Sequence, residues 1–515
     1  MWIKQPVERQ LRDCRQPFSF FFDLIHKYWR AGDKANDLAF HRICTFARKH
    51  GATDLAIQCA LDRADVREEI EVLNDSYGSV GTAEAVTITF FVQPSAAQSI
   101  HAIANECIIG TLTIINYKAE NSQEWECSYI YEAIIVPPFQ VDNTGRRLKV
   151  TNNFMVYDAK FDRTIHDRDY TFNGVYYCQQ NSLTHVCAHA CLRMALNTIN
   201  YTSPPITSNK INQTLTLLPP IQGLTIDEIV KFAKDVNGVA PMVADCSKVL
   251  REDYLAILSS YVESGCMVLL VFTINGGIEH VVTVFGYTRN SDEWHPQAVP
   301  AYSGPKTAQY YSGSAWVDHF LIHDDNFGPY YALSSRALEV DPEVAAHWII
   351  AISDFAADFS PHYAESLASV VALSFDELAG YGNGKWFDYI TGIQHTYVMR
   401  AILMKRSKYK DHLIDLRGHD GTALVPEEIA LTDQLPEWFW MVEFSLPPLF
   451  TGNKSKLGEI FISTNSYEGT VKHILGFRLP SLFVFGDGEG GFFESQNSLL
   501  SHSQYYRAHE HDNEW

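Results

Sequence analysis

The sequence predicts an α+β protein made of three modules, at residues 1–165, 166–355 and 356–515. Two observations carry this prediction. A chain of 515 residues is too long to fold around one compact core. In the first two modules, segments with helical periodicity come before segments typical of strands, which is an α+β order. The third module mixes both patterns, so it is predicted to be a mixed α/β structure.

The N-terminal module is predicted to begin with helices and to continue with strands. Up to about residue 80, two stretches have helical apolar spacing, and the first ends at a glycine: "DLAFHRICTFARKHG" and "DLAIQCALDRADVREEIEVLND". From Val86 the pattern changes to three strand-like runs, with a short helical piece between the first two: "VTITFFV", "IIGTLTIINY" and "CSYIYEAIIV". Pro137, Pro138 and the polar "DNTGRR" predict a boundary region.

The central module is predicted to place three helices before its sheet, at residues 188–200, 226–236 and 253–264. Thr225 and Glu228 have the spacing of a capping box, which supports a helix start there. Three strand-like runs follow the helices: "MVLLVFTI", "HVVTVFGYT" and "HFLIH".

The C-terminal module combines a helix-like stretch with strands. The helix-like stretch is "YITGIQHTYVMRAILMKRSKYKDHL", and the strand-like runs are "WFWMVEFSL" and "LGEIFIST". The last residues, "SHSQYYRAHEHDNEW", are polar and are predicted to be mobile.

Composition excludes several classes of function. Sixty-one acidic against 40 basic side chains give a net charge of −21, which repels nucleic acid and anionic lipid as principal partners. The longest apolar run in the middle of the chain, "MVLLVFTI", is too short to span a membrane. The N-terminus lacks the apolar core of a signal peptide, and the ten cysteines follow no repeating spacing. A cytoplasmic protein with reduced thiols is therefore predicted.

Two cysteines in "QQNSLTHVCAHACLRMALN" are predicted to differ in role. Cys191 lies on a helical stripe of apolar residues, so it is interpreted as a small buried side chain. The other members of the stripe are Ala188, Leu192, Ala195, Leu196 and Ile199. Cys187 stands at the start of the same helix, where unpaired backbone N–H groups and the helix dipole stabilise a thiolate. We therefore expect Cys187 to react and Cys191 to pack.

A zinc site at Cys187, His189 and Cys191 is not predicted. Alternate residues on a helix point about 200° apart, so His189 cannot face the same ion as either cysteine. No second CxxC pair completes a ligand set. Neither a metal nor a cofactor is expected.

The groups that a nucleophilic cysteine needs follow it in order along the chain. His280 immediately precedes an apolar strand, and Asp324 and Asp325 end the strand "HFLIHDD" before a glycine turn. Singly, such a histidine is more often a surface or satisfied side chain, and such carboxylates usually serve the turn. Together they have the order of a nucleophile, a base and an orienting carboxylate.

Residues 170–335 resemble the papain-like cysteine peptidases, in the branch related to bacteriocin-processing (double-glycine leader) peptidases. "CAHACLRMAL" is similar to the family's Cys-Gly-x-x-x-Leu-x-Met helix, and "HVVTVFGYT" to its histidine strand. Three further stretches correspond to its second helix, its Ser-Gly-x-Pro strand entry and its Asp-Pro-x-x-Gly ending: "GLTIDEIVKFAKDVNG", "YVESGCMVLLVF" and "LIHDDNFG". The resemblance implies a papain-like core, with helices followed by an antiparallel sheet.

The resemblance also implies roles for four residues. Cys187 would be the nucleophile, His280 the general base and Asp324 the residue that orients the imidazole. The family's oxyanion glutamine stands six residues before the cysteine, where this chain has Asn181. A one-residue insertion makes Gln180 the first choice and Asn181 the second. Two further departures are Ala188 in place of glycine and Asp325 in place of proline, and Asp324 keeps the family's distance to Gly328.

The function implied is acyl transfer through a thioester. The first hypothesis is a soluble cysteine hydrolase that cleaves an amide bond in a peptide or protein. A protein deamidase or a transglutaminase would use the same triad. The hypothesis from another class is a catalytically inactive, peptidase-like scaffold that binds peptides. The flanking modules are expected to recruit substrate or a regulatory protein partner.

Overall fold

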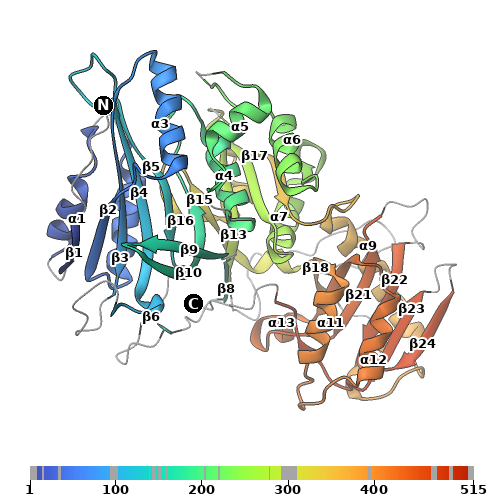
Figure 1. Cartoon of the computed structure of the whole chain (residues 1–515). Coiled ribbons are helices and arrows are strands. Elements are labelled where there is room, and N and C mark those ends of the chain that lie inside the picture. Colours follow the sequence, from blue (N-terminus) through green and yellow to red (C-terminus); the bar gives the residue numbers. More distant parts are fainter. Residues whose placement is uncertain are drawn as a thin grey trace.

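Three seven-stranded sheets form the framework of the molecule, with helices on their faces (Figure 1). The computed structural model describes residues 8–13, 17–32, 36–92, 102–137, 140–141, 147–148, 153–156, 159–201, 204–218, 221–277, 279–290, 310–392, 396–465, 473–486 and 491–507.

The N-terminal sheet is antiparallel, in the order β1-β2-β3-β4-β5-β10-β9. Its strands are β1 Glu8–Asp13, β2 Asp54–Cys59, β3 Thr82–Phe91, β4 Ile108–Lys118, β5 Cys127–Ile135, β9 Ala159–Ile165 and β10 Arg168–Tyr177. Helices α1 Phe18–His26 and α2 Leu38–Lys49 cover one face, and α3 Ala64–Tyr77 covers the other. Strands β6 Gln140–Val141 and β7 Arg147–Leu148 form a separate small sheet.

The central sheet has the order β11-β17-β12-β13-β15-β16, with β8 also paired to β13. Its strands are β8 Asn153–Val156, β11 Met242–Asp245, β12 Met267–Ile274, β13 His280–Arg289, β15 Val317–Asp324, β16 Gly328–Ser334 and β17 Val344–Ile352. Its helices are α4 Cys187–Ile199, α5 Ser208–Leu215, α6 Ile226–Asn237, α7 Tyr254–Glu263 and α8 Ser335–Val340. Side chains alternate between two cores along β12, which explains its uninterrupted apolar sequence.

The C-terminal sheet has the order β14-β18-β19-β21-β22-β23-β24 and is antiparallel except for the parallel pair β14–β18. Its strands are β14 Tyr310–Ser312, β18 Tyr397–Lys405, β19 Trp438–Ser445, β21 Gly458–Ser463, β22 Ile474–Leu479, β23 Leu482–Gly486 and β24 Phe492–Gln496. Its helices are α9 Pro361–Leu373, α10 Lys385–Gly392, α11 Arg406–Asp415, α12 Pro426–Ala430 and α13 Pro447–Gly452. Strands β20 Ser455–Lys456 and β25 Ser503–Gln504 pair beside it.

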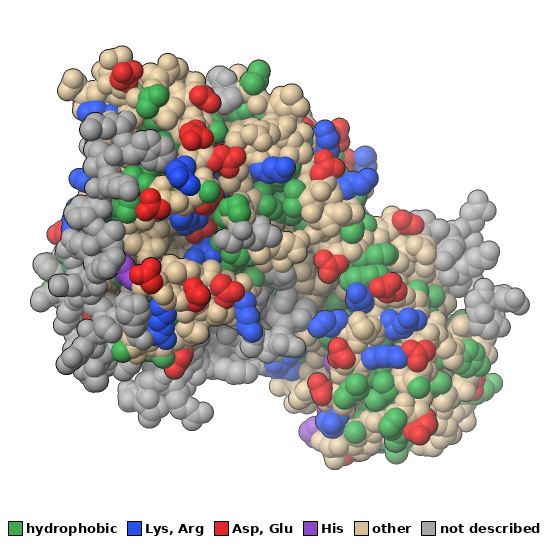
Figure 2. All heavy atoms as spheres, in the orientation of Figure 1, with side chains coloured by type: hydrophobic (Ala, Val, Ile, Leu, Met, Phe, Trp, Pro, Cys, Tyr) green, Lys and Arg blue, Asp and Glu red, His purple; other side chains and the backbone are tan. Residues whose placement is uncertain are grey.

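Helix α4 lies between the N-terminal and central sheets, against β10 on one side and β13 on the other (Figure 1). One hydrophobic core accordingly joins these two parts of the chain. It contains Leu112 of the N-terminal sheet, Leu192 and Leu196 of α4, and Phe285 of the central sheet. A second core joins the opposite face of the central sheet to the C-terminal sheet. Acidic and basic side chains are interspersed on the face drawn in Figure 2.

The predicted α+β class is confirmed, and so are the three helices of the central module and its capping box. Two helix predictions are wrong in part. Asp54–Cys59 is strand β2, and Tyr397–Lys405 is strand β18 between β14 and β19. Both segments are short and mostly buried, and such apolar runs carry no periodicity that separates a strand from a helix.

The predicted module boundaries stay predictions, but two strands lie across them. The expected boundary at residue 165 falls in the β9–β10 hairpin, and β10 pairs with β5 of the N-terminal sheet. Strand β14 joins the C-terminal sheet although it precedes residue 356. Of the tail predicted to be mobile, residues 501–507 are described and include β25, whereas 508–515 lie outside the described residues. Pro138 and residues 142–146 of the predicted boundary region also lie outside them. Among the described residues, no helix combines the length and apolar character needed to cross a membrane.

Candidate active site

Cys187 is the first residue of α4, as predicted. Val186 precedes it with an extended backbone, and its side chain has no hydrogen-bonding group to cap the helix. The first N–H groups of a helix have no carbonyl partner within the helix and create a positive end. The Cys187 thiol therefore lies where negative charge is stabilised, at the wall of a cleft.

Cys191, one turn further along α4, is wholly buried in the core shared by the two sheets. Its Sγ donates to the carbonyl oxygen of Val281 at 3.2 Å. Burial raises the pKa of this thiol well above its ordinary value, which keeps it protonated. The predicted burial of Cys191 is confirmed.

His189 also turns away from a common site with the two cysteines. Its Nε2 lies 2.8 Å from the amide oxygen Oδ1 of Asn212, on the neighbouring helix α5. Burial lowers the pKa of His189 to about 4, against the opposing effect of the Asn212 hydrogen bond. This histidine is a neutral structural side chain on the buried side of α4.

We expect His189 to make the protein less stable in mild acid. The unfolded chain binds a proton at this histidine below a pH of about 6.5, whereas the folded chain binds one only near 4. Stability is therefore lost as the pH falls from about 6.5 to about 4, by up to roughly 3 kcal/mol. Urea unfolding of the wild type and of His189→Gln across this range measures the difference. Parallel pH profiles of the two proteins would contradict the expectation.

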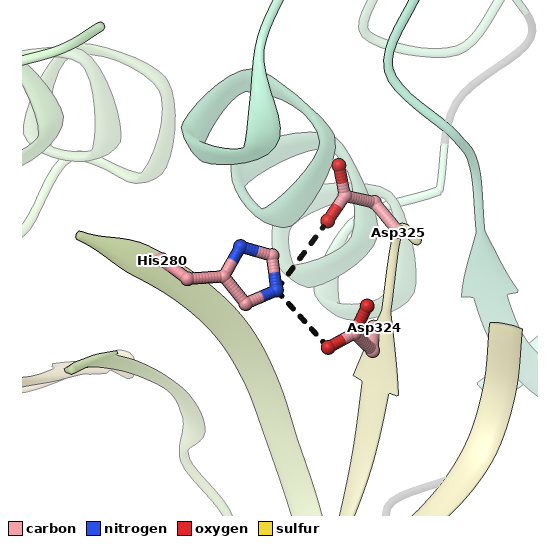
Figure 3. A group of neighbouring side chains, drawn as sticks. All are labelled: His280, Asp324 and Asp325. Atoms are coloured by element: carbon pink, nitrogen blue, oxygen red, sulfur yellow. Dashed lines mark hydrogen bonds and ion pairs between the residues drawn. The ribbon is translucent and has the colours of Figure 1, made fainter. Parts of the chain in front are cut away.

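His280 begins strand β13, opposite Phe272 of β12. Its Nε2 lies 3.0 Å from Oδ2 of Asp324, and the thiol of Cys187 is close enough to the ring to help raise its pKa. Figure 3 shows Nε2 facing the carboxylates, while the other ring nitrogen, Nδ1, points away from them. Since Nε2 is engaged by Asp324, we assign the thiol contact to Nδ1.

Asp324 ends strand β15, and the following turn fixes its carboxylate. Oδ1 accepts hydrogen bonds from the backbone N–H groups of Asn326 at 2.8 Å and Phe327 at 3.0 Å. The other oxygen, Oδ2, is thereby directed at His280 (Figure 3). The turn chemistry expected of a strand-end aspartate and the orienting role implied by the family resemblance are thus compatible, because each uses a different oxygen.

The electrostatics favour a charged imidazole. Burial lowers the pKa of His280, but hydrogen bonds to Asp324 and Cys187 and the charges of Asp324 and Asp325 outweigh it, raising the pKa to about 10. At neutral pH the ring is an imidazolium next to the sulfur of Cys187. That is the protonation state in which it can donate a proton to a leaving group.

Asp325, the second candidate carboxylate, lies on the same side of the ring but farther from it. Its Oδ1 is 3.8 Å from Nε2 of His280. Burial raises the pKa of Asp325 to about 7, against the lowering effect of the His280 charge. Asp324 is therefore the better placed hydrogen-bond acceptor.

We expect Asp324→Asn to impair catalysis more than Asp325→Asn. The first substitution removes the acceptor at 3.0 Å that fixes the ring, whereas the second leaves it in place. The loss for Asp324→Asn should be on the order of tenfold or more in kcat/KM. Should Asp325→Asn prove the weaker enzyme, the 3.8 Å carboxylate would be the orienting group. Steady-state kinetics of both variants decides between them.

A cleft of about 750 Å³ brings the candidate residues together. Cys187, His280 and Gln180 line it, together with Asn326. The Nε2 group of Gln180 donates to Oδ1 of Asn326 at 3.4 Å. Asn181, the second choice for the oxyanion role, instead donates to Thr184 Oγ1 at 2.8 Å and is not among the residues that line this cleft.

No family model, no curated protein and no solved structure matches this chain. The resemblance to papain-like peptidases therefore stays a prediction. In the structure, Cys187, His280 and Gln180 line one cleft, and Asp324 lies behind His280, to which it is hydrogen-bonded.

Sequence reasoning missed the support that helix α2 and the residues just before it provide to the turn after Asp324. Arg42 donates from Nε to the carbonyl oxygen of Pro329 at 2.7 Å, and Asn36 donates from Nδ2 to that of Asn326 at 2.8 Å. Gly328, with φ of +115°, lies so close to α2 that a Cβ would come within 3.1 Å of Cα of Ala39. These contacts join distant parts of the chain, so no local sequence pattern predicts them.

Proposed function

We propose that this chain is a cysteine hydrolase that cleaves an amide bond in a peptide or protein. The observation that carries the proposal is the line from the Cys187 thiol through the His280 imidazole to the Asp324 carboxylate at the wall of one cleft. A thiol at a helix start, an imidazole that exchanges its proton and a carboxylate that orients the ring are the parts that acyl transfer requires.

In the proposed reaction, Cys187 reacts as a thiolate whose proton is held by His280 as an imidazolium; the sulfur attacks the substrate carbonyl carbon and the carbonyl π electrons move to oxygen. His280 donates its proton to the amide nitrogen as the C–N bond breaks, which releases an amine and leaves a thioester. Water then gives a proton to His280 and adds to the thioester, and the C–S bond breaks. Backbone N–H groups at the start of α4 and the Gln180 amide would hold the oxyanion.

The walls of the cleft suit a polypeptide substrate. Beside the polar groups, one wall is apolar and is formed by α6 and the segment that precedes it, with residues Leu224, Ile226 and Ile229. Glu279 adds a carboxylate next to His280. Such a mixture of apolar and polar groups accommodates a side chain beside the peptide bond under attack.

The same geometry also fits two alternative functions: another thioester reaction, or peptide binding without catalysis. A protein deamidase or a transglutaminase would use the same thioester, so the released group separates these reactions from peptide cleavage. An inactive scaffold that binds peptides would keep the cleft without the chemistry. We further propose that the flanking modules recruit substrate or a regulatory partner.

The test combines probe labelling with substrate trapping. An electrophilic probe should label Cys187 at neutral pH ahead of the partly exposed Cys59, Cys107 and Cys127, which serve as internal references in peptide mass mapping. Proteins captured by Cys187→Ala are then incubated with the wild type and analysed for cleaved chains and for ammonia. Cleaved chains support the hydrolase, whereas ammonia release without cleavage indicates a deamidase. Labelling of Cys187 no faster than that of the references would overturn the proposal.

A further inference from the structure

Three side chains beside the catalytic cleft have the spacing of metal ligands. His280, Asp324 and Asp325 each offer one ligand atom, and these atoms lie within 4.8 Å of one another. Nε2 of His280 is 3.0 Å from Oδ2 of Asp324 and 3.8 Å from Oδ1 of Asp325. These distances bracket the separation of about 3.3 Å between neighbouring ligands in a tetrahedral zinc site with bonds of about 2.0–2.1 Å.

The buried carboxylate of Asp325 is independent evidence for a cation-binding site at these three residues. Its side chain is fully buried, and neither carboxylate oxygen has a hydrogen-bond partner among the described residues. The hydroxyl of Tyr177 lies nearby but donates to the backbone carbonyls of Asp324 and Asp325, at 3.2 and 3.3 Å, rather than to the carboxylate. Figure 3 shows Asp325 directed at the same ring nitrogen as Asp324. The His280 ring lies 3.8 Å from Oδ1, beyond hydrogen-bonding distance, so it supplies charge but no hydrogen bond. A buried carboxylate without hydrogen-bond partners is costly unless a closely bound cation neutralises it.

In a second cluster of the described part of the chain, a lysine side chain, and not a metal ion, neutralises the buried carboxylates. His412, Glu443 and Glu459 also lie at ligand spacing. The ammonium group of Lys456 occupies their centre, at 2.8 Å from His412 Nε2, 2.5 Å from Glu443 and 2.7 Å from Glu459. No lysine or arginine is paired with Asp325 among the ion pairs of the described residues.

We propose that His280, Asp324 and Asp325 form a site for a divalent transition-metal cation of the size of Zn²⁺, and that its occupation switches the hydrolase off. The metal ion would replace the proton on Nε2, with water as a fourth ligand. The neutral ring would then carry its remaining proton on Nδ1, facing Cys187, and could not accept the thiol proton. The regulatory consequence rests on the proposed function, whereas the metal site does not.

Metal binding can be measured without any substrate. The background is the full-length Cys187→Ala variant, in which the active-site thiol cannot bind the metal. Calorimetric titration with Zn²⁺ should show one site that is lost, or weakened at least tenfold, when Asp325→Asn is added. Asp324→Asn, made in the same background, should weaken Zn²⁺ binding as well. This second variant tests the site independently, in case Asp325→Asn fails to fold. Thermal unfolding of each variant checks its fold.

Visible absorption spectroscopy with cobalt(II) provides a second measurement of metal binding at the same site. Bound at a nitrogen and oxygen site, it should produce visible absorption bands without a thiolate charge-transfer band, and Asp325→Asn should remove them. In the wild type, Zn²⁺ should slow the labelling of Cys187 by iodoacetamide, and Asp325→Asn should relieve this effect. A metal held by the thiol itself would slow labelling equally in both proteins.

The outcomes separate the two proposals. Equal Zn²⁺ stoichiometry and affinity with and without Asp325→Asn would overturn the metal site, whatever the catalytic activity. Zn²⁺ binding that depends on Asp325, in a chain whose Cys187 is unreactive, would uphold the site and overturn the hydrolase.

Discussion

Replacing Cys187 by alanine is expected to abolish both catalysis and thiol labelling at the cleft, with little change in thermal stability. The thiol is the only group in the proposed site that can form the thioester, so no other side chain substitutes for it. Its position at the first turn of α4, at the cleft wall, means that few packing contacts are lost. Intact-protein mass spectrometry with iodoacetamide, and a differential scanning measurement of Tm, check the two halves of this result.

Cys191→Ala is the matched control on the same helix. Cys191 is wholly buried and does not line the cleft, and its thiol donates to the backbone carbonyl of Val281. The variant should keep activity and lose about 1 kcal/mol of unfolding free energy to the cavity it leaves. Reactivity at Cys191 together with a purely structural Cys187 would reverse the two roles and remove the basis of the proposed mechanism.

His280→Ala is expected to reduce kcat/KM at least about a hundredfold, the usual cost of losing a general base. The ring contacts Asp324 and Cys187 in the cleft and is only partly buried, so the fold should persist. His347→Ala provides the control. That histidine is also partly buried on the central sheet, in β17, and contacts Thr273 at 3.1 Å. Near-normal activity in His280→Ala would exclude the imidazole from the chemistry.

Much of the site could be predicted from local patterns. The start of α4 follows from an apolar stripe that begins after Val186, and the strand that His280 opens is visible as a nearly continuous apolar run. The turn after Asp324 is marked by its own residues, since an aspartate before a glycine commonly accepts backbone hydrogen bonds. Each of these features depends on neighbours in sequence, which is why the chain alone reveals them.

Other features depend on distant partners and could not be predicted. Strand β18 has the apolar sequence of a helix or a strand, and only its pairing with β14 and β19 selects the strand. The contacts of Arg42 and Asn36 with the turn after Asp324 join segments that are almost 300 residues apart in the chain. The hydrogen bond from Gln180 to Asn326 likewise needs the folded cleft. The choices between Gln180 and Asn181, and between Asp324 and Asp325, also depended on geometry of this kind.

The hydrophobic core shared by the N-terminal sheet and α4 limits how this chain can be divided. A recombinant fragment that begins at residue 166 would leave Leu192 and Leu196 of the nucleophile's helix without the strands that cover them, and would lose Arg42 as well. Such a truncation would expose apolar surface and invite aggregation instead of yielding a minimal enzyme. The smallest piece of this chain that folds on its own and carries the proposed site therefore has to include the N-terminal sheet.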